Sequence, residues 1–266
     1  MKQLFVILAL SVVCFAAAGQ DTRKSNSSRK SKKKEKINAM IKQEEEGVIS
    51  FKKHWAIGGK LTTDGYGAFF EKGFAKSVKK ASLVQLEITE RKHQKEEKQS
   101  ALGGGLPFKY GKINFFYPIK LGFQQQFLLG NKSNKNGVSI TANVGGGIAL
   151  GLLRPYTISM ADSTGKVRDM RYDSEADQYY FMRANIDPTS AGPGLSKGWK
   201  YLKMTPGLYL KTGLRFDYGK FNEMLNAIEV GLTGEFYSKK IPQMILVKQK
   251  QFFFGAYFAL MMGRRK

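Results

Sequence analysis

The sequence predicts an all-β protein, an antiparallel transmembrane β-barrel of about eight strands that follows a basic, disordered N-terminal tail. Three observations support this fold class. Apolar and polar residues alternate with a period of two along eight segments. Several segments keep the alternation for about 10 residues, the length that a tilted strand needs to cross a bilayer. The polar positions hold glycine, small polar residues and single charges of both signs, which a narrow barrel can enclose.

The first residues have the composition of a secretory signal peptide, predicted here as residues 1–19. Lys2 precedes an apolar run at 4–15 and a small-residue exit at 16–19. The run is shorter than the roughly 20 residues of a membrane-spanning helix. Cys14 suggests a lipoprotein as an alternative, but valines rather than small residues precede it. We expect cleavage between Gly19 and Gln20, which leaves a mature chain without cysteine and therefore without disulfides or thiol chemistry.

The next segment, 20–52, is predicted to be a disordered periplasmic tail. Residues 23–36 (RKSNSSRKSKKKEK) are basic, rich in serine and free of apolar residues, and the whole chain has a formal net charge of +23. The segment is either a solvated linker or an arm that binds anionic cell-envelope polymers or lipid headgroups. Because the chain is exported, nucleic acid is not expected as a partner. Residues 53–266 then form the barrel.

The first four strands are expected at 55–62, 66–74, 82–90 and 113–127. The first two are joined by TDG at 63–65, a tight-turn signal. Pro118 lies inside the fourth segment and cannot donate a ladder hydrogen bond, so we expect a bulge or a strand start there.

The last four strands are expected at 138–153, 207–219, 226–237 and 251–263. Long connections at 92–112 and 159–200 alternate with short turns at 76–81, 129–137 and 218–224. Long loops outside and short turns inside are typical of outer-membrane barrels, with the short TDG turn as the exception.

The alternation also predicts which side chains face lipid and which face the lumen. We expect a lumen charge network of Lys60, Glu71, Glu87, Lys120, Lys211, Arg215, Glu229 and Glu235. We expect the lumen to be filled by Phe69, Phe116, Tyr209, Tyr237, Phe253 and Tyr257. Aromatic residues near strand ends should form the two interfacial girdles: Trp55, Tyr66, Phe115, Tyr117, Tyr218, Phe236 and Phe252. The alternative is a soluble antiparallel sheet with exposed salt bridges.

The sequence predicts no enzyme site, no metal site and no cofactor. The chain has two histidines, of which His93 lies in a charge run and His54 is expected at the membrane interface. Neither stands beside a serine on a strand, as nucleophilic catalysis would require. Residues 173–177 (DSEAD) begin like a calcium loop but lack its glycine and its later glutamate.

Four segments resemble uncharacterised outer-membrane β-barrel proteins of Bacteroidota. They are GKLTTDGYGAFFEKG at 59–73, the segment 109–140, GGGIALGLLRPY at 145–156 and TGEFYSKKIPQM at 233–244. The resemblance covers roughly 50–266, and Gln20 after the expected cleavage site agrees with it. It implies a barrel in the outer membrane and brings no catalytic residues.

Three functions follow as hypotheses. The first is a small outer-membrane barrel with a structural or interaction role through its long outer loops and basic tail. The second is a barrel subunit of a secretion or surface-export complex. The third is a lipid-modifying enzyme of the outer membrane. The expected partners are outer-membrane lipid, anionic cell-envelope polymers or a secretion-machine subunit.

Overall fold

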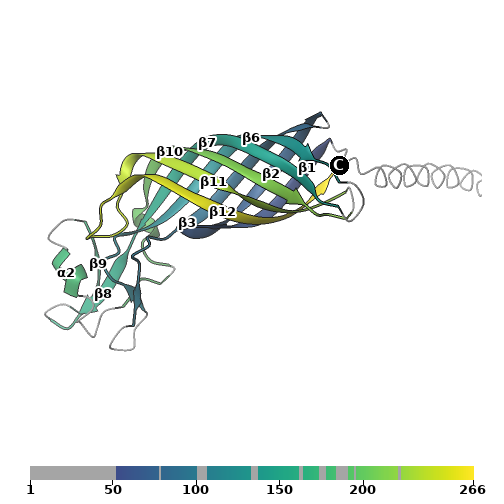
Figure 1. Cartoon of the computed structure of the whole chain (residues 1–266). Coiled ribbons are helices and arrows are strands. Elements are labelled where there is room, and N and C mark those ends of the chain that lie inside the picture. The colour runs from purple at the N-terminus through teal and green to yellow at the C-terminus, as the bar shows by residue number, and fades with distance from the viewer. Residues whose placement is uncertain are drawn as a thin grey trace, which may run out of the picture.

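The computed structural model describes residues 52–77, 79–100, 107–132, 137–161, 164–173, 178–183, 191–194, 196–220 and 223–266. Eight antiparallel strands close into one barrel (Figure 1), which confirms the predicted fold class. Around the barrel they are β1 (Lys53–Thr62), β2 (Gly65–Ser77), β3 (Lys80–Arg91), β6 (Asn114–Gly130), β7 (Ser139–Pro155), β10 (Lys203–Asp217), β11 (Met224–Ile241) and β12 (Lys250–Arg265). The predicted signal peptide at 1–19 and nearly all of the tail at 20–52 lie outside the described residues.

The first and last strands close the barrel. β1 pairs with β12 from His54 opposite Arg265 to Thr62 opposite Tyr257, so the sheet of eight strands has no free edge. The strands are 10 to 18 residues long, which matches the length of tilted strands that cross a bilayer. Among the described residues, no helix is long and apolar enough to cross a membrane.

Side chains alternate between the outside and the lumen on every barrel strand, and the outside is apolar. On β1, Trp55, Ile57 and Leu61 are exposed, whereas Ala56 and Lys60 between them are buried. A water-soluble sheet would do the opposite, because burying charge and exposing large apolar side chains to water are both costly. The pattern therefore excludes the soluble-sheet alternative and is that of a transmembrane barrel.

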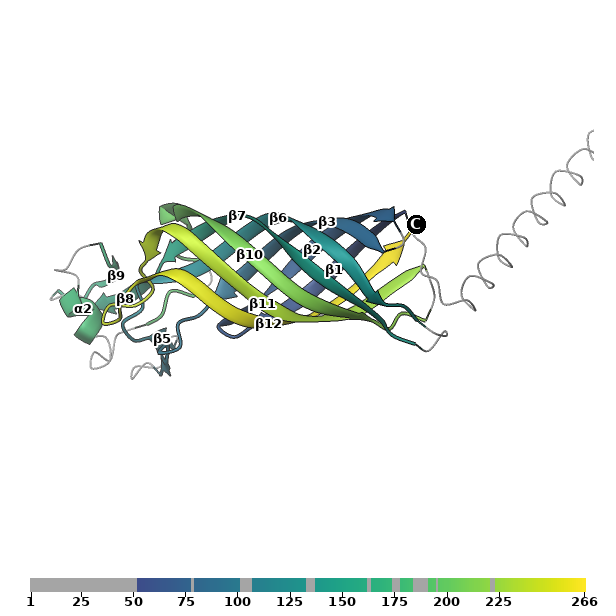
Figure 2. The ribbon, with the colours of Figure 1, turned by 45° about the horizontal axis from the view of Figure 1, so that its top comes forward.

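The two ends of the barrel differ. One end carries the long connections and both termini of the barrel lie at the other (Figures 1 and 2). We call these the loop end and the terminal end. We call the described residues within 92–113, 156–202 and 242–249 the loop assembly. It holds β4 (Lys98–Gln99), β5 (Phe108–Lys109), β8 (Thr157–Ala161), β9 (Val167–Arg171), α2 (Gln178–Arg183) and the 3₁₀ turn η2 (Trp199–Tyr201).

The loop assembly has more regular structure than the sequence predicts. The stretch 159–200 was expected as a loop, yet β8 pairs with β9 in a hairpin. Ile158 and Met160 of β8 are buried in a small apolar cluster with Phe108 and Phe115. Phe115 was expected in the exposed aromatic girdle; this is wrong, because Tyr156 covers it at 5.3 Å between ring centres and leaves it 8% exposed.

Pro118 also behaves differently from the prediction. It causes neither a bulge nor a strand start, because β6 keeps one register with β7 on both sides of the proline. Instead, the ladder with β3 is interrupted: Ile88 pairs with Ile119, and pairing resumes only at Arg91 opposite Phe116. The missing amide donor of proline explains a local gap without a change of register.

Candidate functional site: the lumen charge network

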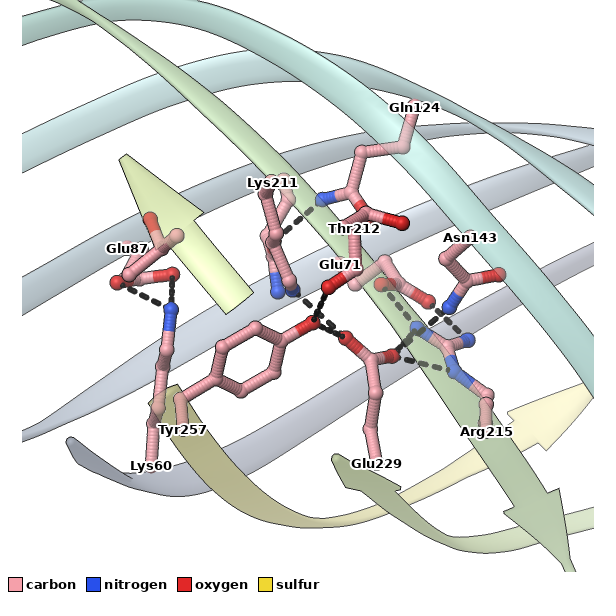
Figure 3. A network of polar contacts seen from close by, with 12 residues as sticks. Lys60, Glu71, Glu87, Gln124, Asn143, Lys211, Thr212, Arg215, Glu229 and Tyr257 are labelled. Atoms are coloured by element: carbon pink, nitrogen blue, oxygen red, sulfur yellow. Dashed lines mark hydrogen bonds and ion pairs between the residues drawn. The ribbon is translucent and has the colours of Figure 1, made fainter. Parts of the chain in front are cut away.

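All eight residues predicted for the lumen network are buried inside the barrel. Figure 3 shows most of them pointing toward one another from different strands. They come from every barrel strand except β7 and β12, and their inward direction follows from the period of two along each strand. The structure divides them into two linked groups.

The first group is built around Arg215 of β10. Its guanidinium donates to both carboxylate oxygens of Glu71 at 2.7 and 2.8 Å and from Nε to Glu229 at 2.8 Å. Glu229 faces Arg215 directly in the β10–β11 ladder and also binds Lys211, at 2.8 Å. The hydroxyl of Tyr257 donates at 2.8 Å to Oε1 of this carboxylate, the oxygen that Lys211 also binds. Glu229 therefore joins two cations and a phenol.

The second group lies around Lys120 of β6. Its ammonium lies 2.6 Å from Glu87 and 2.7 Å from Glu235. Glu87 also accepts two hydrogen bonds from Lys60, at 2.9 Å each. Glu235 is bound in addition by Arg91, at 2.8 Å. Each carboxylate of this group thus meets two cations, which offsets the cost of removing the charges from water.

Lys211 and Arg215 lie on the strand next to Glu235, but Glu235 binds Lys120 and Arg91 instead. Glu235 faces Tyr209 in the β10–β11 ladder, nearer the loop end than Lys211. Its carboxylate reaches across the lumen to the cations of β3 and β6. Strand neighbours could be read from the sequence, but contacts across the lumen depend on strand tilt and barrel closure.

Several members of the lumen network were not among the residues predicted from the sequence. Arg91 lies one residue beyond the expected end of its strand, and its inward parity with Glu87 would have identified it. Polar side chains also complete the network: Asn143 donates to Glu229 at 2.8 Å, and Lys211 donates to Gln85 at 3.1 Å. Tyr237 donates to Glu235 at 2.8 Å. Asn143, Gln85 and Tyr237 each lie at an inward-facing position of their strand, which the alternation along the sequence indicates.

The position of His54 differs from the prediction. It was expected at the membrane interface, but it is buried in the lumen with Nε2 3.2 Å from Glu71. The reason is parity, because His54 precedes the outward-facing Trp55 and so points inward.

Aromatic rings fill the rest of the lumen, as predicted: all six expected side chains are buried. Toward the loop end, Phe116, Tyr237 and Phe253 form a contact layer with ring centres 5.3 to 5.9 Å apart. Near the middle, glycine makes room for the rings. A Cβ atom on Gly122 would lie 2.2 Å from the hydroxyl of Tyr209, so no larger residue fits without a shift.

The terminal end holds a cavity of about 250 Å³ that reaches Arg215. Its wall includes Asp217, which binds Arg265 and lies 3.7 Å from Lys132. The charge network thus separates this cavity from the aromatic layer.

The arrangement can hold strands together and fill space. Within the described ranges, no group of three or more histidine, cysteine, aspartate and glutamate side chains is placed to hold a metal ion. Of the stretch 173–177, which begins like a calcium loop, only Asp173 lies within the described residues, where it binds Arg171. His93 accepts a hydrogen bond from the amide of Lys95, at 3.1 Å, in the turn after β3.

No protein-family model matches the chain, and no curated protein sequence matches it. Solved structures with which it aligns include Neisserial surface protein A (10% identity, TM-score 0.37, 80% of this chain and 95% of that one). They also include the N-terminal β-barrel domain of Pseudomonas aeruginosa OprF (11%, 0.35, 80% and 98%) and Ail of Yersinia pestis in complex with the heparin analogue sucrose octasulfate (11%, 0.35, 80% and 97%).

Proposed function

We propose that this protein is an outer-membrane barrel with a closed lumen, and that it acts as an interaction protein through its loop assembly at the cell surface. The observation that carries the proposal is the contrast between a filled lumen and an elaborated loop end. Outer-membrane barrels place long loops outside and short turns in the periplasm, which orients the loop end outward.

The filled lumen argues against transport. A barrel of eight strands is just wide enough for side chains to fill it. Here, matched charges occupy its middle and a layer of three aromatic rings lies toward the loop end. An ion crossing the barrel would have to displace both layers.

The remaining parts of the chain extend this proposal. Residues 1–19 are removed on export, and the basic tail at 20–52 lies in the periplasm, where anionic cell-envelope polymers are its partners. We propose a chain of Bacteroidota origin without enzymatic activity. The burial of His54 against Glu71 supports a structural role for this histidine rather than a catalytic one.

Planar-bilayer recording of the purified full chain tests the closed lumen. We expect no stable conductance steps. A variant with Phe116→Ala, Tyr237→Ala and Phe253→Ala removes the aromatic layer and should give small, fluctuating currents. Large, ohmic steps from the unmodified protein would contradict the proposal and assign a porin role.

Site-specific crosslinking in cells tests the interaction role against the secretion-subunit alternative. The mature chain is expected to lack cysteine, so a single thiol can be placed at the exposed Lys248 of the loop end or at the exposed Lys76 of the terminal end. Surface interaction predicts crosslinked partners from Lys248→Cys. Partners captured only through Lys76→Cys, within one large envelope complex, would favour the export subunit instead.

A further inference from the structure

A second candidate site lies outside the lumen, in a cleft of about 330 Å³ at the loop end. Its floor includes Tyr66 of β2, Glu90 of β3 and Tyr117 of β6. These residues share the outward face with the exposed Phe70, Ile88 and Leu121 of the same strands. Residues of the loop assembly form the opposite wall. The cleft therefore opens beside the barrel, next to the surface that contacts lipid, and not into the lumen.

The lining of the cleft is strongly cationic. Four cations, Lys92, Lys98, Lys109 and Arg154, face one carboxylate, Glu90, which accepts a hydrogen bond from Tyr66 at 2.8 Å.

The four cations are held in different ways. Lys109 is bound by Glu96, and the guanidinium of Arg154 lies 4.1 Å from the ring centre of Phe115. Lys92 and Lys98 are exposed, and within the described part of the chain neither forms an ion pair. Lys92 rests over the ring of Tyr66, at 4.8 Å. Two lysines are thus available to an anionic ligand at the mouth of the cleft.

The cleft continues directly into the apolar outer wall. Tyr66 pairs with Glu90 in the β2–β3 ladder, and the next outward-facing pair toward the membrane is Ala68 with Ile88. Ile88 in turn pairs with Ile119 of β6, just before the gap that Pro118 makes in the β3–β6 ladder. A ligand with a charged head and an apolar tail would meet complementary surfaces at both of its ends.

We propose that this cleft binds the phosphate-bearing sugar headgroup of an outer-leaflet glycolipid. Its phosphate would be bound by Lys92 and Lys98, its sugar ring would contact Tyr66 and Tyr117, and its acyl chains would lie along Ile88. Ammonium groups bind phosphate through charge-assisted hydrogen bonds. Tyrosine suits an interface because one end of its ring system is apolar and the other polar. The volume lies at the small end of ligand pockets, about 300–1,000 Å³.

The continuity with the lipid face favours a membrane lipid over a soluble anionic saccharide, because a saccharide has no acyl chain to contact the apolar wall. The inference rests on the proposed function for its orientation, since only an outward loop end brings the cleft to the outer leaflet.

Native mass spectrometry of the full chain in detergent tests the cleft. The probes are bis-phosphorylated lipid A, the same lipid without phosphates, and phosphatidylcholine. The cleft variant is Lys92→Gln with Lys98→Gln. The matched control is Lys239→Gln with Lys240→Gln, which removes the same charge from exposed positions on β11 outside the cleft. We expect the cleft variant to weaken binding of bis-phosphorylated lipid A on the order of tenfold, and the control by less than about twofold.

Three results would overturn the inference. One is equal weakening by the two double variants, which would indicate attraction by net charge alone. Another is equal binding of the phosphorylated and dephosphorylated lipids. The third is displacement of the lipid by millimolar inorganic phosphate or by a soluble polysulfated disaccharide as effectively as by lipid A. Heat-modifiable gel mobility checks that each variant is folded. Bilayer recording of the same preparation tests the closed lumen separately, and crosslinking in cells through Lys248→Cys tests the outward loop end, so failure of either proposal is recognised.

Discussion

The lumen and the cleft at the loop end both contain several lysine and arginine side chains, but these charges are paired with carboxylates in the lumen and outnumber the carboxylates in the cleft. In the lumen, five cations meet carboxylates at 2.6 to 2.9 Å, and almost no water reaches them. In the cleft, four cations face one carboxylate, and two of the lysines are exposed. Buried charge must be matched within the chain because desolvation is costly, whereas exposed charge can remain for a ligand. The difference separates a structural use of charge from a binding use.

Removal of a lumen carboxylate should have the largest effect. Glu229→Ala leaves Lys211 without a carboxylate and deprives Arg215 of one of its two. Breaking a buried pair in this way costs about 3–5 kcal/mol. Urea unfolding of the purified protein in detergent micelles, followed by tryptophan fluorescence, should show a loss of this size.

An exposed pair of the same chemistry provides the control. Glu223 lies 3.4 Å from Arg264 at the terminal end, with both side chains more than half exposed. Glu223→Ala should cost less than about 1 kcal/mol. Adding Lys211→Met to Glu229→Ala should recover part of the lost stability, because the double variant leaves fewer uncompensated charges. Equal losses from Glu229→Ala and Glu223→Ala would refute the claim that the lumen charges are desolvated.

A second prediction compares the barrel wall with the loop assembly. Leu210 on the outside of β10 is 74% exposed, and Leu246 in the β11–β12 connection is 67% exposed. In water, arginine would be tolerated equally well at both positions. In a bilayer, Leu210→Arg should cost about 2–4 kcal/mol, because it places a cation at the lipid face near the middle of the strand. Leu246→Arg should stay within about 0.5 kcal/mol of the parent protein.

Folding titrations into lipid vesicles measure both substitutions, with heat-modifiable gel mobility as the readout. A similar small effect of both arginines would place the wall of β10 in water and contradict the transmembrane assignment. Arginine at the lumen position Thr233 would be a poorer comparison, because that residue is buried in a filled interior.

The barrel could be predicted from the sequence because its signal is local. Each strand alternates in isolation, so the inward direction of Lys60 or Glu229 needs no knowledge of the partner strands. The same rule would have placed His54 and Arg91 in the lumen had the first and third strands been extended by one residue at those ends. These errors concern strand boundaries, where local signals are weakest.

Contacts between distant segments could not be predicted in this way. The pairing of Glu235 with Lys120 and Arg91 depends on how the closed barrel brings β11 opposite β3 and β6. Burial of Phe115 depends on a loop more than 40 residues later, since Tyr156 covers it. The cleft depends both on the local alternation along its strands and on contacts between distant segments. In the sequence, its lysines looked like an ordinary solvated charge run.

The last predicted effect is confined to the loop assembly, where Glu96 binds Lys109 and Lys112. Burial alone would raise the pKa of Glu96, but the two ammonium groups outweigh it and hold the pKa below its usual value. The carboxylate therefore stabilises the assembly fully above about pH 4.3, its ordinary pKa, and this contribution is lost as the pH falls through the lowered value.

Hydrogen exchange detected by mass spectrometry measures this contribution in peptides that span 107–113. At pH 7, Glu96→Gln should speed exchange there by an amount that corresponds to about 1.5–3 kcal/mol, because two nearly buried ammonium groups lose their charged partner. The effect should shrink below about pH 4, because the parent protein then protonates the same carboxyl. Strand β7 should exchange at the same rate in both proteins, since the lumen network is intact. If the variant instead loosened β7 to the same degree, the loop assembly and the barrel would unfold as one unit, and the contrast between the two regions would fail.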